Sequence, residues 1–402
     1  MYDVVWPSTE RTRTMGNALV QSAEVRARAA RWLFQERCPD WNLAFVVAGE
    51  IHSAIENFWH GVDPGHPLHD LPSASQAGSQ LRAVYRATDA LVGELMSAFP
   101  DATVVVFAMN GMGPNLSDVA SMVLLSELLY RQNFGRPLLR VPRRWADAPR
   151  GLPMTDAEMP WSQAVNTFIQ QFPAPLDMMR RLAAQTLPEG LKKLLRPNHT
   201  HEAPASKDRV LRLPLDWMPT ELYQRHWRTM RYFALPSFYD GRVRINLAGR
   251  ERNGLVSPGD YESVCDELES LVRACRDTRT GEPVVDRVER CGGSNPLEIG
   301  PSECDLVFVW RSAALGLDHP AHGRIGPVPY RRTGGHTGPY GMAFICGSGM
   351  AAGEYGVRSS YDVVPTIVEL LGEPLPPQLS GCSLLALTKD HSSVSDPPPR
   401  QK

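Results

Sequence analysis

The chain has 402 residues, of which 43% are hydrophobic and 21% charged, a balance typical of globular proteins and not of disordered or membrane-embedded ones. Its formal net charge of -2 offers no concentrated basic surface, so we expect no nucleic-acid partner. No apolar run approaches the roughly 18 residues of a membrane span, and the seven cysteines contain no CxxC pair. We therefore expect a cytoplasmic protein in a reducing compartment, without a membrane partner.

Short apolar runs alternate with helical patterns along the chain. The runs are expected to be strands at residues 43–48, 102–108, 305–310 and 342–346. The helical patterns cover residues 18–34, 80–99 and 117–130. Because the runs lack polar alternation, they favour strands that are buried on both faces of a mostly parallel sheet. The sequence therefore predicts an α/β fold of three layers, α/β/α, around such a sheet.

Two segments differ from this pattern in their amino-acid composition. Residues 136–230 are rich in Pro and Arg, with helical pieces at 178–187 and 191–195, which predicts a helical or irregular insertion. Residues 389–402 are polar and proline-rich, which predicts a disordered tail. The expected organisation is one domain over residues 1–388, carrying the insertion, followed by the tail.

The densest group of candidate metal ligands follows the first apolar run. Four histidines fall between residues 52 and 69. If a helix begins after residue 48, His52 and Glu56 lie one turn apart on one face and can hold one ion from two directions. A plain contact between these two side chains on the helix surface explains the spacing equally well.

A further histidine and a glycine-rich turn also stand out. His336 lies among Gly334, Gly335 and Gly338, where few side chains are available to form a core around it. It is therefore a better ligand candidate than an isolated histidine. The run at 102–108 leads into Met109 and a glycine-containing turn, a pattern that is more often structural than functional.

Taken in order, these segments resemble the type I phosphodiesterase/nucleotide pyrophosphatase branch of the alkaline phosphatase superfamily. The resemblance covers most of residues 40–385. It rests on the following segments: the histidine-rich stretch ending in Phe58-Trp59-His60, the turn Gly111-Met112-Gly113-Pro114, residues 241–251, residues 305–310, residues 333–341 and residues 361–372. It implies the alkaline-phosphatase-like fold and hydrolysis of phosphoric or related esters.

The resemblance also implies which residues bind metal. Members of this branch hold two ions, and by position the first site corresponds here to His52, Glu56 and His336. Two imidazoles and one carboxylate suit zinc, with manganese as the alternative. The second site corresponds to Met109 and Asn110, a thioether and an amide that replace a carboxylate and an imidazole. We therefore expect one ion and a degenerate second site.

The nucleophile of the family has no counterpart in the first 40 residues, so no catalytic residue is assigned. It could lie upstream of the given sequence. Without it, the sequence predicts a divergent hydrolase in which a metal-bound water attacks a small anionic ester, a phosphate or a sulfate. The alternative is an inactive relative, a pseudoenzyme that serves as a binding or assembly module. Oligomeric state cannot be read from these patterns.

Two arginines are candidate anion-binding groups. Arg244 and Arg250 lie close together in the sequence, and guanidinium groups match phosphate or sulfate in a bidentate manner. Structural ion pairing, with Glu251 for example, accounts for the same residues equally well.

Overall fold

The computed structural model describes residues 8–155, 159–169, 217–293, 295–347 and 352–385. They belong to two compact units. One unit is Leu116–Arg331, and the other combines the described parts of Val4–Asn115 and Arg332–Lys402. The predicted pieces at 178–187 and 191–195, and the predicted tail at 389–402, lie outside the described residues.

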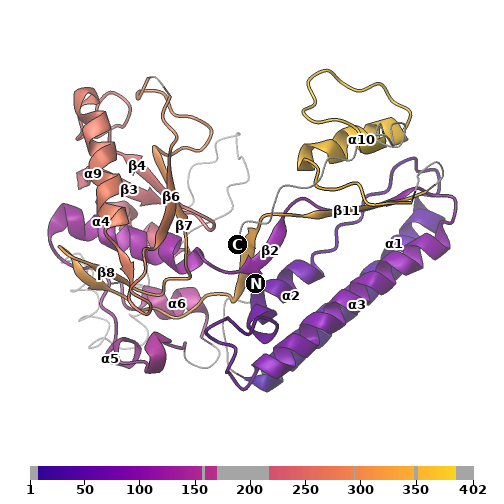
Figure 1. The fold of residues 1–402 in the computed structure, drawn as a ribbon, viewed down its shortest axis with the longest axis horizontal. Helices are drawn as coiled ribbons and strands as arrows, with labels where there is room; N and C mark the ends of the chain where they lie inside the picture. Colours follow the sequence, from indigo (N-terminus) through magenta and orange to yellow (C-terminus); the bar gives the residue numbers. More distant parts are fainter. Residues whose placement is uncertain (1–7, 156–158, 170–216, 294, 348–351, 386–402) are drawn as a thin grey trace, which may run out of the picture. The chain divides into compact units, whose positions relative to one another are not determined.

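The unit that combines two stretches of chain is built on long helices (Figure 1). Its helices are α1 (Thr9–Trp32), extended by a π-helical turn (Leu33–Arg37), α2 (Glu50–Phe58) with a 3-10 turn (Trp59–Gly61), α3 (Ala74–Ala98), and α10 (Val363–Leu370) after a 3-10 turn (Ser360–Asp362). Helices α1 and α3 run side by side. Their shared core contains Met15, Ala54, Phe58, Leu81 and Val84.

Two antiparallel strand pairs complete this unit. Strand β1 (Val104–Ala108) pairs with β11 (Met342–Cys346), so that Val106 lies opposite Phe344. Strand β2 (Gly111–Pro114) pairs with β10 (Gly334–Gly338). Each pair brings together segments that are more than 200 residues apart in the chain.

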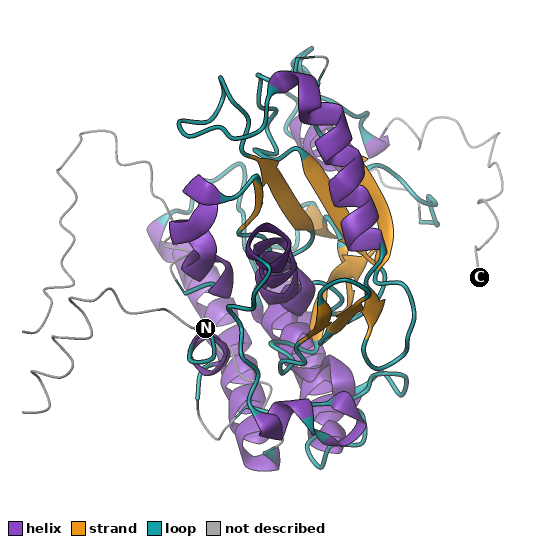
Figure 2. Cartoon of the chain, turned by 90° about the vertical axis from the view of Figure 1, so that its left-hand side faces the viewer, coloured by secondary structure: helices purple, strands orange, loops and turns teal. Residues whose placement is uncertain are grey.

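The other unit contains a four-stranded antiparallel sheet in the order β3-β4-β7-β6 and a three-stranded antiparallel sheet in the order β5-β8-β9. The strands are β3 (Tyr232–Leu235), β4 (Gly241–Ile245), β5 (Arg276–Asp277), β6 (Val285–Arg290), β7 (Leu306–Trp310), β8 (Leu317–His319) and β9 (Gly323–Ile325). Figure 2 draws the strands in orange. Helix α4 contacts β3, and α9 contacts β6.

The helices of this unit are α4 (Leu125–Phe134) after a π-helical turn (Ala120–Leu124), α5 (Arg143–Ala146), α6 (Trp161–Asn166) and α9 (Tyr261–Arg273). It also has 3-10 turns at Pro149–Gly151, Pro219–Thr229 and Pro258–Asp260. The described parts of the expected insertion at 136–230 hold α5, α6 and two of these 3-10 turns, with an isolated bridge between Leu139 and Ile169.

The predicted fold class is wrong. Among the described residues every pairing between named strands is antiparallel, and the largest sheet has four strands, so there is no large parallel central sheet and no three-layer α/β/α arrangement around one. Three of the four apolar runs do form strands, as β1, β7 and β11. They are divided between the two units, because β7 pairs with β4 and β6 while β1 and β11 pair with each other.

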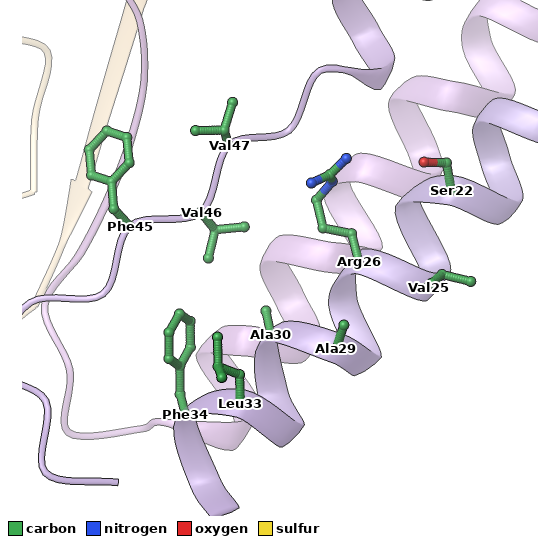
Figure 3. A pocket seen from close by; sticks show the side chains of 10 residues that line it. All are labelled: Ser22, Val25, Arg26, Ala29, Ala30, Leu33, Phe34, Phe45, Val46 and Val47. Carbon is green, nitrogen blue, oxygen red and sulfur yellow. The ribbon is translucent and has the colours of Figure 1, made fainter. Parts of the chain in front are cut away.

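The fourth apolar run, residues 43–48, is extended but belongs to no strand. With the C-terminal part of α1 it lines an open groove of about 410 Å³ (Figure 3). Val46 points towards α1, whereas Phe45 and Val47 point away from it and are 61% and 66% exposed. The ring of Phe45 contacts that of Phe107 in β1, with 6.1 Å between centroids. The run therefore has the alternation of a strand without a backbone partner.

No helix in the described part of the chain has the length and apolar character needed to span a bilayer.

Candidate metal centre

Helix α2 and strand β10 carry the three predicted ligands. His52 and Glu56 lie one turn apart on α2, as the sequence predicted, and His336 lies at the middle of β10. The first turn of α2 is fixed by its buried Glu50, which accepts hydrogen bonds from Ser22 at 2.7 Å and from Arg26 at 2.8 Å. Both of these donors belong to α1, so the helix that presents the ligands is held at its start by an ion pair.

A close backbone contact joins β10 to α2. The amide of Thr333 donates to the carbonyl oxygen of Glu56 at 2.9 Å. At the next residue, a Cβ atom on Gly334 would meet the carbonyl oxygen of Ile55. Glycine is therefore required at position 334 because the strand approaches the helix backbone directly, and this approach brings His336 to the face of α2 that bears His52.

The three side chains converge on a small volume. The Nε2 atoms of His52 and His336 are 2.8 Å apart, and His52 Nε2 is 3.5 Å from Glu56 Oε1. One donor atom from each residue lies within 4.8 Å of the others. Two nitrogens bound tetrahedrally to one zinc ion, each about 2.1 Å from it, are about 3.4 Å apart. The imidazoles would therefore separate by only about half an ångström to admit an ion, so the donor set fits a zinc site.

Both histidines are held in the form that binds metal. Burial lowers the pKa of His52, and the positive charge of Arg332 lowers it further. Burial likewise lowers the pKa of His336, with added contributions from His52 and Arg332. Both imidazoles are therefore neutral at pH 7, and only a neutral imidazole has a lone pair to offer a metal ion. His52 is 46% exposed at its side chain, which leaves the cluster open to solvent on that side.

Asn110 contacts the cluster directly. Its Nδ2 donates to His336 Nδ1 at 2.9 Å and to the carbonyl oxygen of Gly111 at 3.1 Å. In this arrangement His336 carries its hydrogen on Nε2 and donates it to His52. If His336 held an ion through Nε2, its hydrogen would lie on Nδ1, where Asn110 Oδ1 would accept it after rotation of the amide. Asn110 is thus a positioning residue for His336.

A buried ion pair lies beside the cluster. Arg332 Nη1 donates to Glu56 Oε1, and both residues are almost fully buried, with 6% and 7% exposure. Arg332 therefore neutralises the carboxylate that the sequence assigned as a ligand. The sequence reasoning did not assign Arg332. Its position next to the glycine-rich segment was visible, but its pairing depends on the contact between Thr333 and Glu56, which no local pattern reveals.

The other features singled out in the sequence lie elsewhere. Within the described residues, the cluster of His52, Glu56 and His336 is the one group of three or more residues able to hold a metal ion. Met109, expected in the degenerate second site, is 49% exposed. The histidines that follow His52 do not join the cluster: His60 is buried, with its ring 6.3 Å from that of His66, and His69 Nδ1 lies 2.7 Å from the carbonyl oxygen of His60.

The two candidate anion-binding arginines lie in the other unit, within ion pairs. Arg244 donates to Glu251 at 2.7 Å. Arg250 donates to both carboxylate oxygens of Asp305, each at 2.7 Å, and its side chain is only 5% exposed. These contacts are those of structural ion pairs. Anion binding at Arg244 and Arg250 stays a prediction.

Comparisons of the chain with known protein families, with curated proteins and with solved structures found no match. The resemblance to the phosphodiesterase branch stays a prediction, and the fold that it implied is absent from the described residues. Function is therefore inferred from the chemistry of His52, Glu56 and His336 and of the residues around them.

Proposed function

We propose that His52, Glu56 and His336 bind one divalent metal ion, zinc or manganese, and that the protein hydrolyses a small anionic ester, a phosphate or a sulfate, at this ion. The supporting observation is the convergence of two neutral imidazoles and one carboxylate within 4.8 Å on a partly exposed surface. Such a set of two histidines and one carboxylate leaves a fourth position for water or substrate in catalytic zinc sites.

Each residue has a defined part in this proposal. His52 and His336 would hold the ion through Nε2, and Glu56 would hold it through a carboxylate oxygen. Asn110 orients His336 by its hydrogen bond to Nδ1. A divalent ion in this position supplies Lewis acidity, which polarises an ester oxygen and lowers the pKa of a water molecule.

Arg332 supports an anionic substrate. Its positive charge lowers the pKa of both His52 and His336, so it acts on the volume that they enclose. An ester with a negative charge gains from this second cation, whereas a neutral ester does not. The exposed side of His52 gives such a substrate access to the cluster.

The test measures metal content and hydrolysis in the same preparations. Purified protein supplemented with zinc or manganese should hold about one ion per chain, and His52→Ala and His336→Ala should each lose it together with any esterase activity. His322→Ala is the matched control, because His322 lies in the other unit, where its Nε2 is 2.6 Å from Gln132 Oε1. Protein that holds no ion under any supplementation would refute the proposal.

A second candidate function is a non-catalytic binding or assembly module. One observation favours it, because the Glu56–Arg332 ion pair and the hydrogen bond between His52 and His336 satisfy these side chains without an ion. Metal-loaded protein assayed against phosphomonoesters, phosphodiesters and sulfate esters separates the two functions. Activity that disappears in His336→Ala supports the hydrolase, and background rates on every ester support the module.

A further inference from the structure

Residues 43–48 form an extended segment whose backbone is unpaired. Their side chains alternate as in a strand, because Val46 points towards α1 whereas Phe45 and Val47 point away from it (Figure 3). In the described part of the chain, no hydrogen bond joins the amides or carbonyl oxygens of this segment to another residue. The ring of Phe45 contacts that of Phe107 in β1, so the segment lies next to the sheet formed by β1 and β11. Residues 43–48 therefore have the form of a strand with unpaired edges.

This segment lacks the features that prevent exposed strands from pairing. Proteins usually protect an exposed edge with charged side chains, proline or bulges. Strand β6, at one edge of the four-stranded sheet, is protected in this way, because four of its six residues are charged and all four are exposed. Residues 43–48 read Leu-Ala-Phe-Val-Val-Ala, and no charged residue or proline occurs between Asp40 and Glu50. The chain therefore guards one edge against pairing and leaves this one open to it.

Three apolar side chains of the segment are exposed on one face. Leu43, Phe45 and Val47 alternate along the chain, and they are 54%, 61% and 66% exposed. An extended strand that adds to such an edge satisfies its backbone groups and covers its side chains at the same time. The occupant must therefore offer a strand backbone and an apolar face, and the segment offers no charge to attract a charged one.

A second copy of the same segment meets these requirements. Two-fold symmetry brings two identical strands together antiparallel, and no like charges face each other across the axis because the segment has none. Residues that lie opposite each other share one face of a sheet, and a shift of one residue moves every side chain to the other face. The centred register that keeps the exposed side chains together places Phe45 opposite Phe45 of the partner subunit, and Leu43 opposite Val47 of the partner subunit.

We propose that two copies of the chain pair through residues 43–48 into a two-fold symmetric dimer with Phe45 at its axis. The pairing gives backbone hydrogen bonds to a segment that has none, and it brings two exposed aromatic rings together as a cross-strand pair. The face that bears Val46 stays directed towards α1 in each copy. The dimer needs no metal ion, so it stands independently of the proposed hydrolase.

Sedimentation equilibrium of the full chain tests the dimer. The measured mass should rise with protein concentration from that of one chain to that of two. Phe45→Lys should stay at the mass of one chain, because it places two positive charges directly opposite each other at the axis. Leu255→Lys is the matched control, because Leu255 is 52% exposed and lies in the other unit, and it should leave the dimer intact.

Oxidative cross-linking tests the register. Phe45→Cys should form a disulfide between two copies, because residues opposite each other in antiparallel strands have Cα atoms about 4.5–5.5 Å apart, a separation that a disulfide spans. Val46→Cys should not, because that side chain points towards α1. Peptide mapping distinguishes this link from any made by the exposed native thiols of Cys38 and Cys346.

Hydrogen exchange of the wild-type chain gives a result that needs no variant. The amides of residues 43–48 should exchange more slowly as the protein concentration rises, because the dimer supplies them with acceptors. A mass of one chain at concentrations up to about 100 μM would overturn the proposal. So would a dimer that persists in Phe45→Lys, growth beyond two chains, or exchange of residues 43–48 that does not depend on concentration.

Discussion

The buried His60 predicts a loss of stability in acid. Its side chain lies in the 3-10 turn after α2, where the residue is only 4% exposed. Its Nε2 is 3.4 Å from the hydroxyl of Ser73, and its Nδ1 is 3.4 Å from the hydroxyl of Thr333. These long contacts to hydroxyl groups give a positive charge little compensation. Burial is the main cause that lowers the pKa of His60 to about 4, and the neighbouring His66 and His69 lower it further.

The sign and size of the effect follow from this pKa. In the unfolded chain His60 titrates near its ordinary value of about 6.5. Between pH 6.5 and 4 the unfolded state therefore binds more protons than the folded state, so the free energy of unfolding falls as the pH falls. A pKa near 4 predicts a loss from this group alone of about 2 kcal/mol at pH 5 and about 3 kcal/mol at pH 4, relative to pH 7.5. The stability is fully present above pH 6.5.

Hydrogen exchange of peptides from α2 and α3 measures this loss in the unit that contains His60. His60→Gln is the comparison, because glutamine keeps hydrogen-bonding groups at this position but does not titrate. Comparing the two proteins at the same pH cancels the intrinsic effect of pH on exchange. Protection in the wild-type chain should fall more steeply below pH 6.5 than in His60→Gln. Parallel profiles down to pH 4 would refute the reasoning, because they would mean that His60 takes up a proton without cost to the fold.

Three further predictions concern single side chains. Glu127 is fully buried and accepts hydrogen bonds from Arg131, from Tyr223 and from the amides of Leu138 and Leu139, so Glu127→Ala should cost about 3–5 kcal/mol in urea unfolding. Gly334→Ala should displace β10 from α2 and weaken zinc binding, measured by competition with a chelator. Gly93→Ala, at an uncrowded position of α3, should instead raise the free energy of unfolding in urea by about 0.5–1 kcal/mol. Asn110→Ala removes the hydrogen bond that orients His336 and should weaken zinc affinity by about 10-fold or more. The same chelator competition measures this, with the metal content of the protein as the readout. Unchanged affinity would show that Asn110 does not position the ligand.

The helices could be predicted from the sequence because their signal is local. Apolar residues at three- and four-residue spacing define α1, α3 and α4 without reference to any other part of the chain. Strand identity was also local, and residues 102–108 and 342–346 do form β1 and β11. Their pairing is not local. Val106 lies opposite Phe344 across more than 200 residues, and an apolar run carries no information about which run it pairs with or in which direction.

The apolar runs also did not reveal how exposed their side chains are in the structure. Phe344, in the middle of β11, is 64% exposed, and Phe45 and Val47 are exposed to a similar degree. The inference of a parallel sheet assumed that runs without polar alternation are buried on both faces. In this structure β1 and β11 form a two-stranded sheet, which cannot bury its own faces. The same apolar composition therefore occurs without the layered architecture that usually explains it.

The candidate site could be predicted only in part, because some of its signals are local in the sequence and others are not. The spacing of His52 and Glu56 identified two ligand candidates on one helix face, and the glycines around His336 marked a segment with little core of its own. The contact that completes the cluster is the hydrogen bond from Thr333 to Glu56, which joins residues 277 positions apart. Arg332 enters the site through this same contact, so a reading of local patterns could not include it.

Glu56 is the residue at which the two candidate functions diverge. Its Oε1 accepts from Arg332 and lies 3.5 Å from His52 Nε2, so the same oxygen serves a guanidinium in one state and would serve an ion in the other. An ion can bind without breaking the pair only if Glu56 divides its two oxygens between the cations. Burying a carboxylate costs desolvation free energy, and each neighbouring cation offsets part of that cost. A buried carboxylate that faces two positive charges is therefore better compensated than one that faces a single positive charge. If the proposed ion binds, the charge of Arg332 would lower its affinity through repulsion and would favour an anion beside it. A weakly bound metal and an anionic ligand would then reinforce each other at this site.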